Sequence, residues 1–183
     1  MKIIDIFDAV SDGTLEDFKY YFEQNDININ VVEKHTGMNL LSLTVINDAN
    51  YQDKIKIVKY LISEGIDVNF ICSKDKMNAL HTLHYCNRRS NIDYLIEMTK
   101  LLIENGIDVN AKDKYGAVPL KYAITLNKLP TIELKELYML LLKKGSDYRH
   151  KDVFNKSCLD YAKEYSWRNE FIDIVEEFEN GIK

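Results

Sequence analysis

Cysteine, proline and glycine are scarce in this sequence. Among 183 residues there are three cysteines, two prolines and seven glycines. So little proline and glycine excludes the composition of a disordered polymer. The cysteines Cys72, Cys86 and Cys158 are odd in number and lie 14 and 72 positions apart, which does not suggest a disulfide framework. We therefore expect reduced thiols and a cytoplasmic location.

Long apolar runs are missing as well. No window approaches the roughly 20 uninterrupted apolar residues that a membrane helix needs. At the N-terminus, Asp5 and Asp8 interrupt the apolar residues before the core of a signal peptide can form. The sequence therefore predicts neither a membrane partner nor a secretory signal.

Positive charge is in deficit. Lysine and arginine total 24 against 29 aspartates and glutamates, which gives a net charge of -5 at pH 7. A surface that follows nucleic-acid phosphates is usually basic, so we expect no nucleic-acid partner. Hydrophobic residues make up 46% of the chain, enough for a core, and the length is typical of one domain, predicted to span residues 1–183.

Catalytic motifs are also absent. The sequence has no phosphate-binding glycine loop, no Gly-x-Ser-x-Gly and no His-Glu-x-x-His. We therefore predict that the protein is not an enzyme and has no catalytic residues and no cofactor.

One cluster has the residue types of a metal site, namely His81, His84 and Cys86, with Cys72 upstream. On a single helix, positions 84 and 86 point about 200° apart, because each residue turns the helix by about 100°. The three side chains would therefore not converge on one ion, and we predict no metal site.

The sequence does contain a clear internal repeat. Gly65-Ile66-Asp67-Val68-Asn69 recurs at Gly106–Asn110 and more weakly at Gly145–Tyr148, and Asp26 begins an earlier copy without glycine. The four anchors are 39, 41 and 39 positions apart. Apolar residues at helical spacing precede each anchor, and a second apolar run follows about ten polar residues later. The runs are led by Leu41, Leu80, Leu120 and Leu159. Each unit is predicted to be helix, loop, helix and extended finger.

These units resemble the ankyrin-repeat family. The segment from Asp113 to Ala123 keeps the family's finger aspartate, glycine, Pro-Leu pair and helix alanine, and Asn78-Ala79-Leu80-His81 keeps its histidine. The resemblance implies an all-α ankyrin-repeat solenoid of about five helix-loop-helix repeats. It also implies that the His81 ring bonds the finger backbone. The expected repeats are 1–30, 31–69, 70–110, 111–149 and 150–183, with polar end residues such as Asp17, Lys19, Glu176 and Glu179.

The units depart from the family in one place. Family repeats are about 33 residues long, and the surplus lies between the two helices of a unit, in polar segments that begin at Asn47, Asn87 and Asn127. We therefore expect lengthened inter-helix loops, with Asn50, Asn91 and Thr131 capping the helices that follow. These loops are an alternative interface. Arg88-Arg89 could bind an anion there, although such a pair usually serves solubility.

A solenoid presents an extended curved surface that suits protein binding. The resemblance places partners on the concave side, against fingers and first helices. The predicted partner-binding residues are Phe70, Lys76, Tyr85, Lys114, Tyr115, Tyr122, Thr125, Phe154 and Tyr161. Aromatic side chains supply large contact area at low entropic cost. The alternative, that these rings pack between neighbouring fingers, stays open.

Two functions fit these features. The first is a monomeric protein that binds and inhibits a single protein partner, similar to small ankyrin-repeat immunity proteins that act as antitoxins; the partner would be a toxin or other effector. The short length, the acidic charge and the lack of catalytic motifs or an appended domain favour it. The alternative is an ankyrin-repeat effector or adaptor that acts on host-cell proteins.

Overall fold

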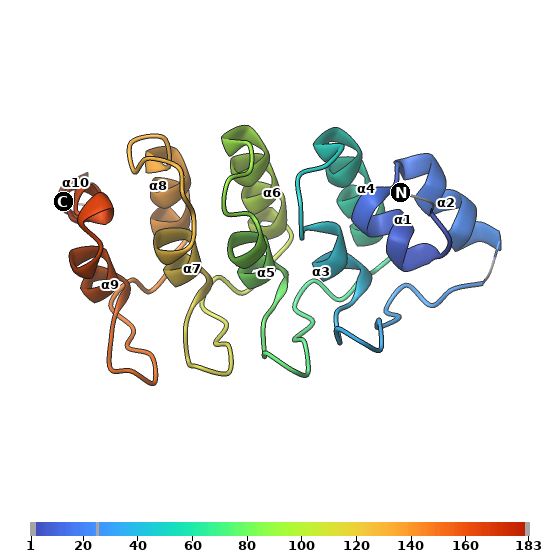
Figure 1. Cartoon of the computed structure of the whole chain (residues 1–183), viewed down its shortest axis with the longest axis horizontal. Helices are drawn as coiled ribbons and strands as arrows, with labels where there is room; N and C mark the ends of the chain where they lie inside the picture. Colours follow the sequence, from blue (N-terminus) through green and yellow to red (C-terminus); the bar gives the residue numbers. More distant parts are fainter. Residues whose placement is uncertain (1–2, 25, 182–183) are drawn as a thin grey trace.

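The computed structural model describes residues 3–24 and 26–181; residues 1–2, 25 and 182–183 of the expected first and last repeats lie outside that description. Within it the chain forms ten α-helices and one 3-10 turn (Figure 1). They are α1 (Ile6–Asp12), α2 (Leu15–Gln24), α3 (Leu40–Thr44), α4 (Tyr51–Ser63), α5 (Ala79–Cys86), α6 (Ile92–Glu104), α7 (Pro119–Thr125), α8 (Lys135–Lys143), α9 (Cys158–Glu164), η1 (Ser166–Arg168) and α10 (Glu170–Gly181). The described residues hold no strand, only an isolated bridge between Val32 and Asn39.

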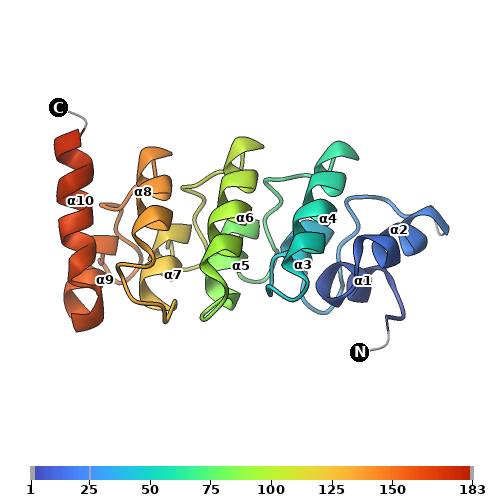
Figure 2. The ribbon, with the colours of Figure 1, turned by 90° about the horizontal axis from the view of Figure 1, so that it is seen from above.

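The helices stack as five antiparallel pairs in one row, which is the all-α repeat solenoid that the sequence predicts (Figures 1 and 2). We call α3, α5, α7 and α9 the inner helices. The segments that precede them are the fingers, residues 26–39, 64–78, 105–118 and 144–157, and the segments that follow them are the inter-helix loops, residues 45–50, 87–91, 126–134 and 165–169. Fingers and inter-helix loops therefore lie at opposite ends of the inner helices. None of the described helices is long and apolar enough to cross a membrane.

The repeated leucines set the register of the core. Leu41, Leu80 and Leu120 stand second in α3, α5 and α7 and are fully buried, as expected. Leu159, second in α9, is only half-buried, because α9 belongs to the last pair and lacks a neighbour on one side. Neighbouring pairs thus bury each other's apolar faces.

The anchor glycines are required by backbone conformation. Gly65, Gly106 and Gly145 have φ angles of 83°, 84° and 86°, a left-handed region that favours glycine, while a Cβ at each would meet nothing within 4 Å. Asp26 adopts the same region with φ 46°, as its place in the repeat predicts. Aspartate tolerates this conformation better than most residues.

The asparagine that ends each of the first three copies of the anchor motif joins one repeat to the next. The Oδ1 atoms of Asn30, Asn69 and Asn110 each accept a hydrogen bond at 2.7 Å. The donors are the backbone N–H groups of Asp67, Asp108 and Asp147, each in the following repeat. This series, which we call the turn ladder, fixes the spacing of neighbouring repeats.

A second series runs along the inter-helix loops. Asn47 Nδ2 donates to the Ser11 carbonyl (3.0 Å), Asn87 Nδ2 to the Val45 carbonyl (2.7 Å) and Asn127 Nδ2 to the Asn87 carbonyl (3.5 Å). We call this series the loop ladder. It explains why these long loops are ordered, since each is bonded to the preceding repeat.

Arg168 continues the loop ladder in the last repeat. Its guanidinium is fully buried and donates to the carbonyls of Ile124 (2.8 Å), Leu129 (2.8 Å) and Asn127 (2.5 Å) and to Thr131 Oγ1 (3.2 Å). All four acceptors lie in or beside the loop 126–134. The arginine therefore holds this loop without a carboxylate partner among the described residues.

The predicted helix caps are right in one case of three. The Asn91 side chain accepts bonds from the N–H groups of Asp93 and Tyr94, so it caps α6. Asn50 stands at the start of α4, but it is left-handed and makes no cap bond. Thr131 is not a cap, because α8 begins after Leu134 and the Thr131 hydroxyl donates instead to the Trp167 carbonyl.

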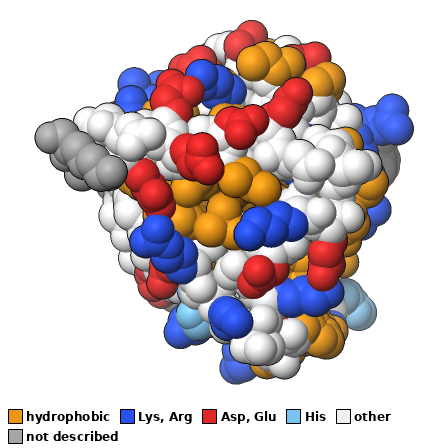
Figure 3. All heavy atoms as spheres, turned by 90° about the vertical axis from the view of Figure 1, so that its left-hand side faces the viewer, with side chains coloured by type: hydrophobic (Ala, Val, Ile, Leu, Met, Phe, Trp, Pro, Cys, Tyr) orange, Lys and Arg blue, Asp and Glu red, His pale blue; other side chains and the backbone are white. Residues whose placement is uncertain are grey.

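The C-terminal end of the solenoid is not uniformly polar. Figure 3 shows hydrophobic side chains at the centre of this end, within a ring of acidic and basic ones. Glu176 is exposed there, as expected of a terminal helix, whereas Glu179 is half-buried and pairs with Arg149 at 2.5 Å.

Candidate partner-binding surface

Hydrogen bonds between neighbours hold the fingers in a row. The Lys114 N–H donates to the Asp75 carbonyl and the Val153 N–H to the Tyr115 carbonyl, each at 2.9 Å. Lys114 Nζ also pairs with Asp75 Oδ1 at 2.5 Å. The tips of the last three fingers therefore form one continuous wall.

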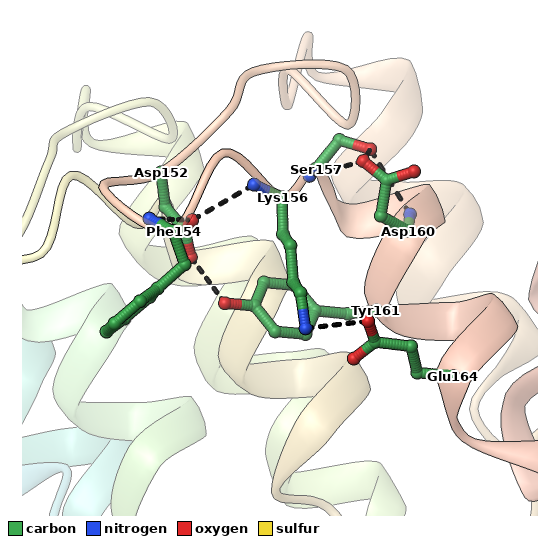
Figure 4. Close-up of polar contacts among 7 residues, drawn as sticks. All are labelled: Asp152, Phe154, Lys156, Ser157, Asp160, Tyr161 and Glu164. Atoms are coloured by element: carbon green, nitrogen blue, oxygen red, sulfur yellow. Dashed lines mark hydrogen bonds and ion pairs between the residues drawn. The ribbon is translucent and has the colours of Figure 1, made fainter.

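A buried aspartate shapes each of the last two fingers. Asp152 Oδ1 accepts from the N–H groups of Phe154 (2.9 Å) and Lys156 (3.2 Å), and its Oδ2 accepts from the Tyr161 hydroxyl at 2.5 Å (Figure 4). Beside it, Ser157 and Asp160 form the capping box of α9. The carboxylate thus closes the finger turn and ties it to the inner helix.

The preceding finger repeats this arrangement. Asp113 Oδ1 accepts from the N–H groups of Tyr115 and Ala117, each at 2.8 Å, and its Oδ2 accepts from the Tyr122 hydroxyl. Burial, and then the bond to Asp113, raise the pKa of Tyr122, so the phenol stays protonated and donates. In the first finger Glu33 stands at the same distance from its anchor and accepts from the N–H groups of His35 and Thr36, whereas the second finger has Cys72 there. The bond from a finger carboxylate to an inner-helix tyrosine is therefore seen only at Asp113 and Asp152 among the described residues.

Three predicted contact residues are therefore not available to a partner as expected. Tyr122, Thr125 and Tyr161 are only 3%, 7% and 9% exposed. The hydroxyls of the two tyrosines donate hydrogen bonds to finger aspartates, and the Thr125 hydroxyl donates to the Lys121 carbonyl. These three side chains therefore pack within the solenoid, the two tyrosines against the finger of their own repeat.

Other predicted contacts do lie at the surface of the fingers. Tyr115 and Phe154 are exposed, and their rings stack with centroids 6.2 Å apart. Lys114 Nζ lies 5.1 Å from the centroid of the Tyr115 ring. Lys76 is exposed and Phe70 is half-buried. The structure thus brings aromatic and cationic side chains from two neighbouring fingers together.

Two further apolar residues complete this surface. Val153 is exposed beside Phe154, and Ile71 is exposed in the second finger. Ile71 was not predicted, because an isoleucine between Phe70 and Cys72 carries no sign in the sequence of being exposed. We call the set Ile71, Lys76, Lys114, Tyr115, Val153 and Phe154 the finger surface.

Several exposed lysines lie on the fingers, although the chain is acidic overall. The exposed ones are Lys34, Lys74, Lys76, Lys112, Lys114 and Lys151. The carboxylates of Asp113 and Asp152 are buried, so a partner at the finger tips would contact the lysines and not these two carboxylates.

Tyr85 lies apart from the finger surface, near the far end of α5. It is exposed, its ring meets Tyr122 edge to face at 5.4 Å, and the Arg88 guanidinium lies 6.0 Å from its centroid. Its neighbours therefore belong to the inner helix α7 and to the inter-helix loop 87–91.

His81 has the structural role that the family resemblance implies. Its Nδ1 accepts from the Asn78 N–H at 3.3 Å and its Nε2 donates to the Ala117 carbonyl of the next finger at 2.9 Å. Burial lowers the pKa of His81, which keeps the ring neutral. In the described part of the chain no group of three or more His, Cys, Asp or Glu side chains could hold a metal ion.

Comparison with known proteins identifies relatives of this architecture. A family model for ankyrin repeats, with three copies, matches residues 48–152. Two proteins named as ankyrin repeat proteins, from Rickettsia felis and Rickettsia bellii, are 31% and 29% identical over 145 and 140 residues. The matches cover 79% and 76% of this chain and 60% and 70% of those proteins. A fowlpox virus protein with the same description is 32% identical over 104 residues, which cover 56% of this chain and 14% of that protein.

Proposed function

Because the chain belongs to the ankyrin-repeat family, whose repeats generally serve protein–protein interaction, we propose that it binds one protein partner through the finger surface and inhibits it. The observation that carries this proposal is the row of exposed aromatic and lysine side chains on fingers that are already bonded to one another.

Such a surface favours affinity for two reasons. The finger backbones are fixed before binding, so less conformational entropy is lost on association. Tyr115 and Phe154 each offer a large ring with few rotatable bonds, the kind of residue that dominates interface energies. We expect these two rings at the centre of the interface.

The lysines suit a partner with an acidic face. Exposed charges at the rim of an interface mainly speed association and set its salt dependence. Lys76 and Lys114 are exposed on the same wall as the rings. The partner is therefore proposed to present apolar and acidic groups together.

The simplest inhibitory mechanism is occlusion of the partner's active site, which needs no cofactor and no turnover. We propose a cytoplasmic protein that is monomeric when unbound, acts as one domain and serves as an immunity or antitoxin-like protein against a toxin. An effector or adaptor role on host-cell proteins is the alternative, and the viral origin of one similar protein favours it.

Affinity capture from the source organism, followed by an assay of the captured protein, separates these functions. The inhibitory role predicts that adding the chain abolishes the partner's activity at a one-to-one ratio. A toxin gene beside the gene for this chain would agree. Unchanged partner activity together with recruitment of a third protein would contradict inhibition and support the adaptor role.

A further inference from the structure

The inter-helix loops form a groove at the end of the inner helices that faces away from the fingers. One hollow of about 660 Å³ is lined by the loops 126–134 and 165–169, and a second of about 570 Å³ by the loops 45–50 and 87–91. Arg89 and Lys128 line both hollows. Because the two hollows share these residues, they form one surface, which we call the loop groove.

The floor of the loop groove is preformed. The loop ladder bonds each of these loops to the preceding repeat, and the Lys128 N–H donates to the Arg88 carbonyl at 2.7 Å. A ligand would therefore meet ordered loops, and binding would not have to order them.

Cations dominate the middle of the loop groove. Arg88, Arg89 and Lys128 are exposed, and none of them forms an ion pair within the described residues. The two lining carboxylates, Asp48 and Glu170, belong to different hollows. An anionic ligand would complement this centre.

Buried Arg168 adds to the positive field. Its guanidinium donates to the Leu129 carbonyl and to Thr131 Oγ1, and both residues line the larger hollow. The acceptors are neutral, so the charge is not cancelled by a carboxylate. A charge held in a poorly polarisable interior is weakly screened, and its effect therefore extends into the adjoining groove.

Aromatic side chains stand beside the cations. The exposed Trp167 ring lies 5.6 Å from Lys128 Nζ, and the exposed Tyr85 ring lies 6.0 Å from the Arg88 guanidinium. Trp167 and Pro130 give the larger hollow an apolar wall. The groove thus offers sites for acidic side chains and for an apolar one.

We propose that the loop groove binds an acidic, extended peptide segment of a protein, with carboxylates at Arg88, Arg89 and Lys128 and an apolar side chain against Trp167. Packed helices lie roughly 8–10 Å apart, so four successive loops span about 30 Å, which about nine residues of extended chain would cover at about 3.3 Å per residue. A peptide is favoured over nucleic acid because Asp48 and Glu170 line the groove and the molecule is acidic overall.

Trp167 makes the proposal directly measurable, because it is the only tryptophan in the chain. The probe is a synthetic 12-residue peptide of glutamate, glycine and serine with one central phenylalanine, and its matched control carries glutamine at every glutamate. We expect a saturable change in Trp167 emission with the acidic peptide that weakens as salt is raised. No saturable change, or equal binding of the glutamine peptide, would overturn the proposal.

Two double variants locate the site. Arg89→Glu with Lys128→Glu changes exposed side chains of the groove and is expected to weaken peptide binding by about tenfold or more. Lys112→Glu with Lys151→Glu makes the same change of charge on the fingers and is expected to leave binding within about twofold. Retained binding in the groove variant, with a native circular dichroism spectrum, would contradict the assignment. A 12-nucleotide deoxythymidine strand that binds as tightly as the peptide would replace it with a nucleic-acid site.

Discussion

Leu120 and Lys121 are adjacent in α7 but differ in environment. Leu120 is fully buried, so Leu120→Ala should lower the free energy of unfolding by about 2 to 5 kcal/mol. Lys121 is half-buried, with Nζ 4.3 Å and 5.4 Å from the ring centroids of Tyr122 and Tyr161. Removing these cation–π contacts in Lys121→Ala should cost no more than about 1 kcal/mol. Urea unfolding of both variants measures the difference, and equal losses would mean that the register is wrong.

His84 should make the protein sensitive to acid. The ring is buried, neither nitrogen has a hydrogen-bond partner among the described residues, and burial lowers its pKa to about 3. An unfolded histidine titrates near 6.5, so the stabilisation is complete above pH 6.5 and is lost as the pH falls from 6.5 towards 3. Between pH 7 and pH 5 the wild type should lose about 2 kcal/mol more than His84→Leu.

The test for His84 is urea unfolding of both proteins at several pH values. His81, whose pKa burial also lowers, is present in both and cancels in the comparison. Parallel pH profiles for wild type and His84→Leu would show that the ring is protonated in the folded state.

For single residues, the sequence predicts the place in the repeat better than the exposure of the side chain. Repeated glycines and leucines place Leu41, Leu80 and Leu120 in the core correctly. The burial of Tyr122 and Tyr161 was missed, because a tyrosine on a helix face carries no sign of what its hydroxyl meets. The available signal was an aspartate nine residues before each of them, at Asp113 and Asp152.

Among the elements, the loop 126–134 depends most on one side chain. Arg168→Met approximates the aliphatic part of the side chain but leaves the carbonyls of Ile124, Asn127 and Leu129 without this donor. Unpaired buried carbonyls are costly, so the free energy of unfolding should fall by about 3 kcal/mol or more. Amide exchange within residues 126–134 should also accelerate.

Arg149→Met is the matched control for this prediction. Its side chain is 67% exposed and pairs with Glu179 at the surface, so its loss should cost less than about 1 kcal/mol. If both variants unfold at the same urea concentration, Arg168 does not hold the loop.

The helix pairs and the long loops were predictable from the spacing of the repeats. The hydrogen bonds that fix the conformation of these loops were not. Asn47, Asn87 and Asn127 recur every 40 residues, and this period was visible in the sequence as the start of each insertion. Their bonds to earlier repeats were not visible, because the acceptors are backbone carbonyls, which leave no mark on the sequence. For the same reason the sequence did not reveal the role of Arg168. Thr131 was expected to cap a helix, but its hydroxyl donates to the Trp167 carbonyl.

Across the whole molecule, three series of hydrogen bonds join neighbouring repeats. The turn ladder joins their anchor motifs, the loop ladder joins their inter-helix loops, and backbone bonds join their finger tips. Such a frame can present side chains from several repeats to one partner without rearrangement. The finger surface and the loop groove, the two binding surfaces that we propose, therefore lie on one rigid support, and substitutions in one should leave the other unchanged.

The central claim, that the finger surface holds a protein partner, is tested most directly by quantitative affinity capture with two variants. Phe154 and Tyr20 are both 62% exposed, but Phe154 lies on a finger and Tyr20 on α2 at the other end of the chain. Proteins enriched by the wild type should fall by about tenfold or more with Tyr115→Ala plus Phe154→Ala, because truncating two central rings removes most of the binding energy. They should be retained with Tyr20→Ala. Full retention by the finger variant, with loss by Tyr20→Ala, would contradict the claim.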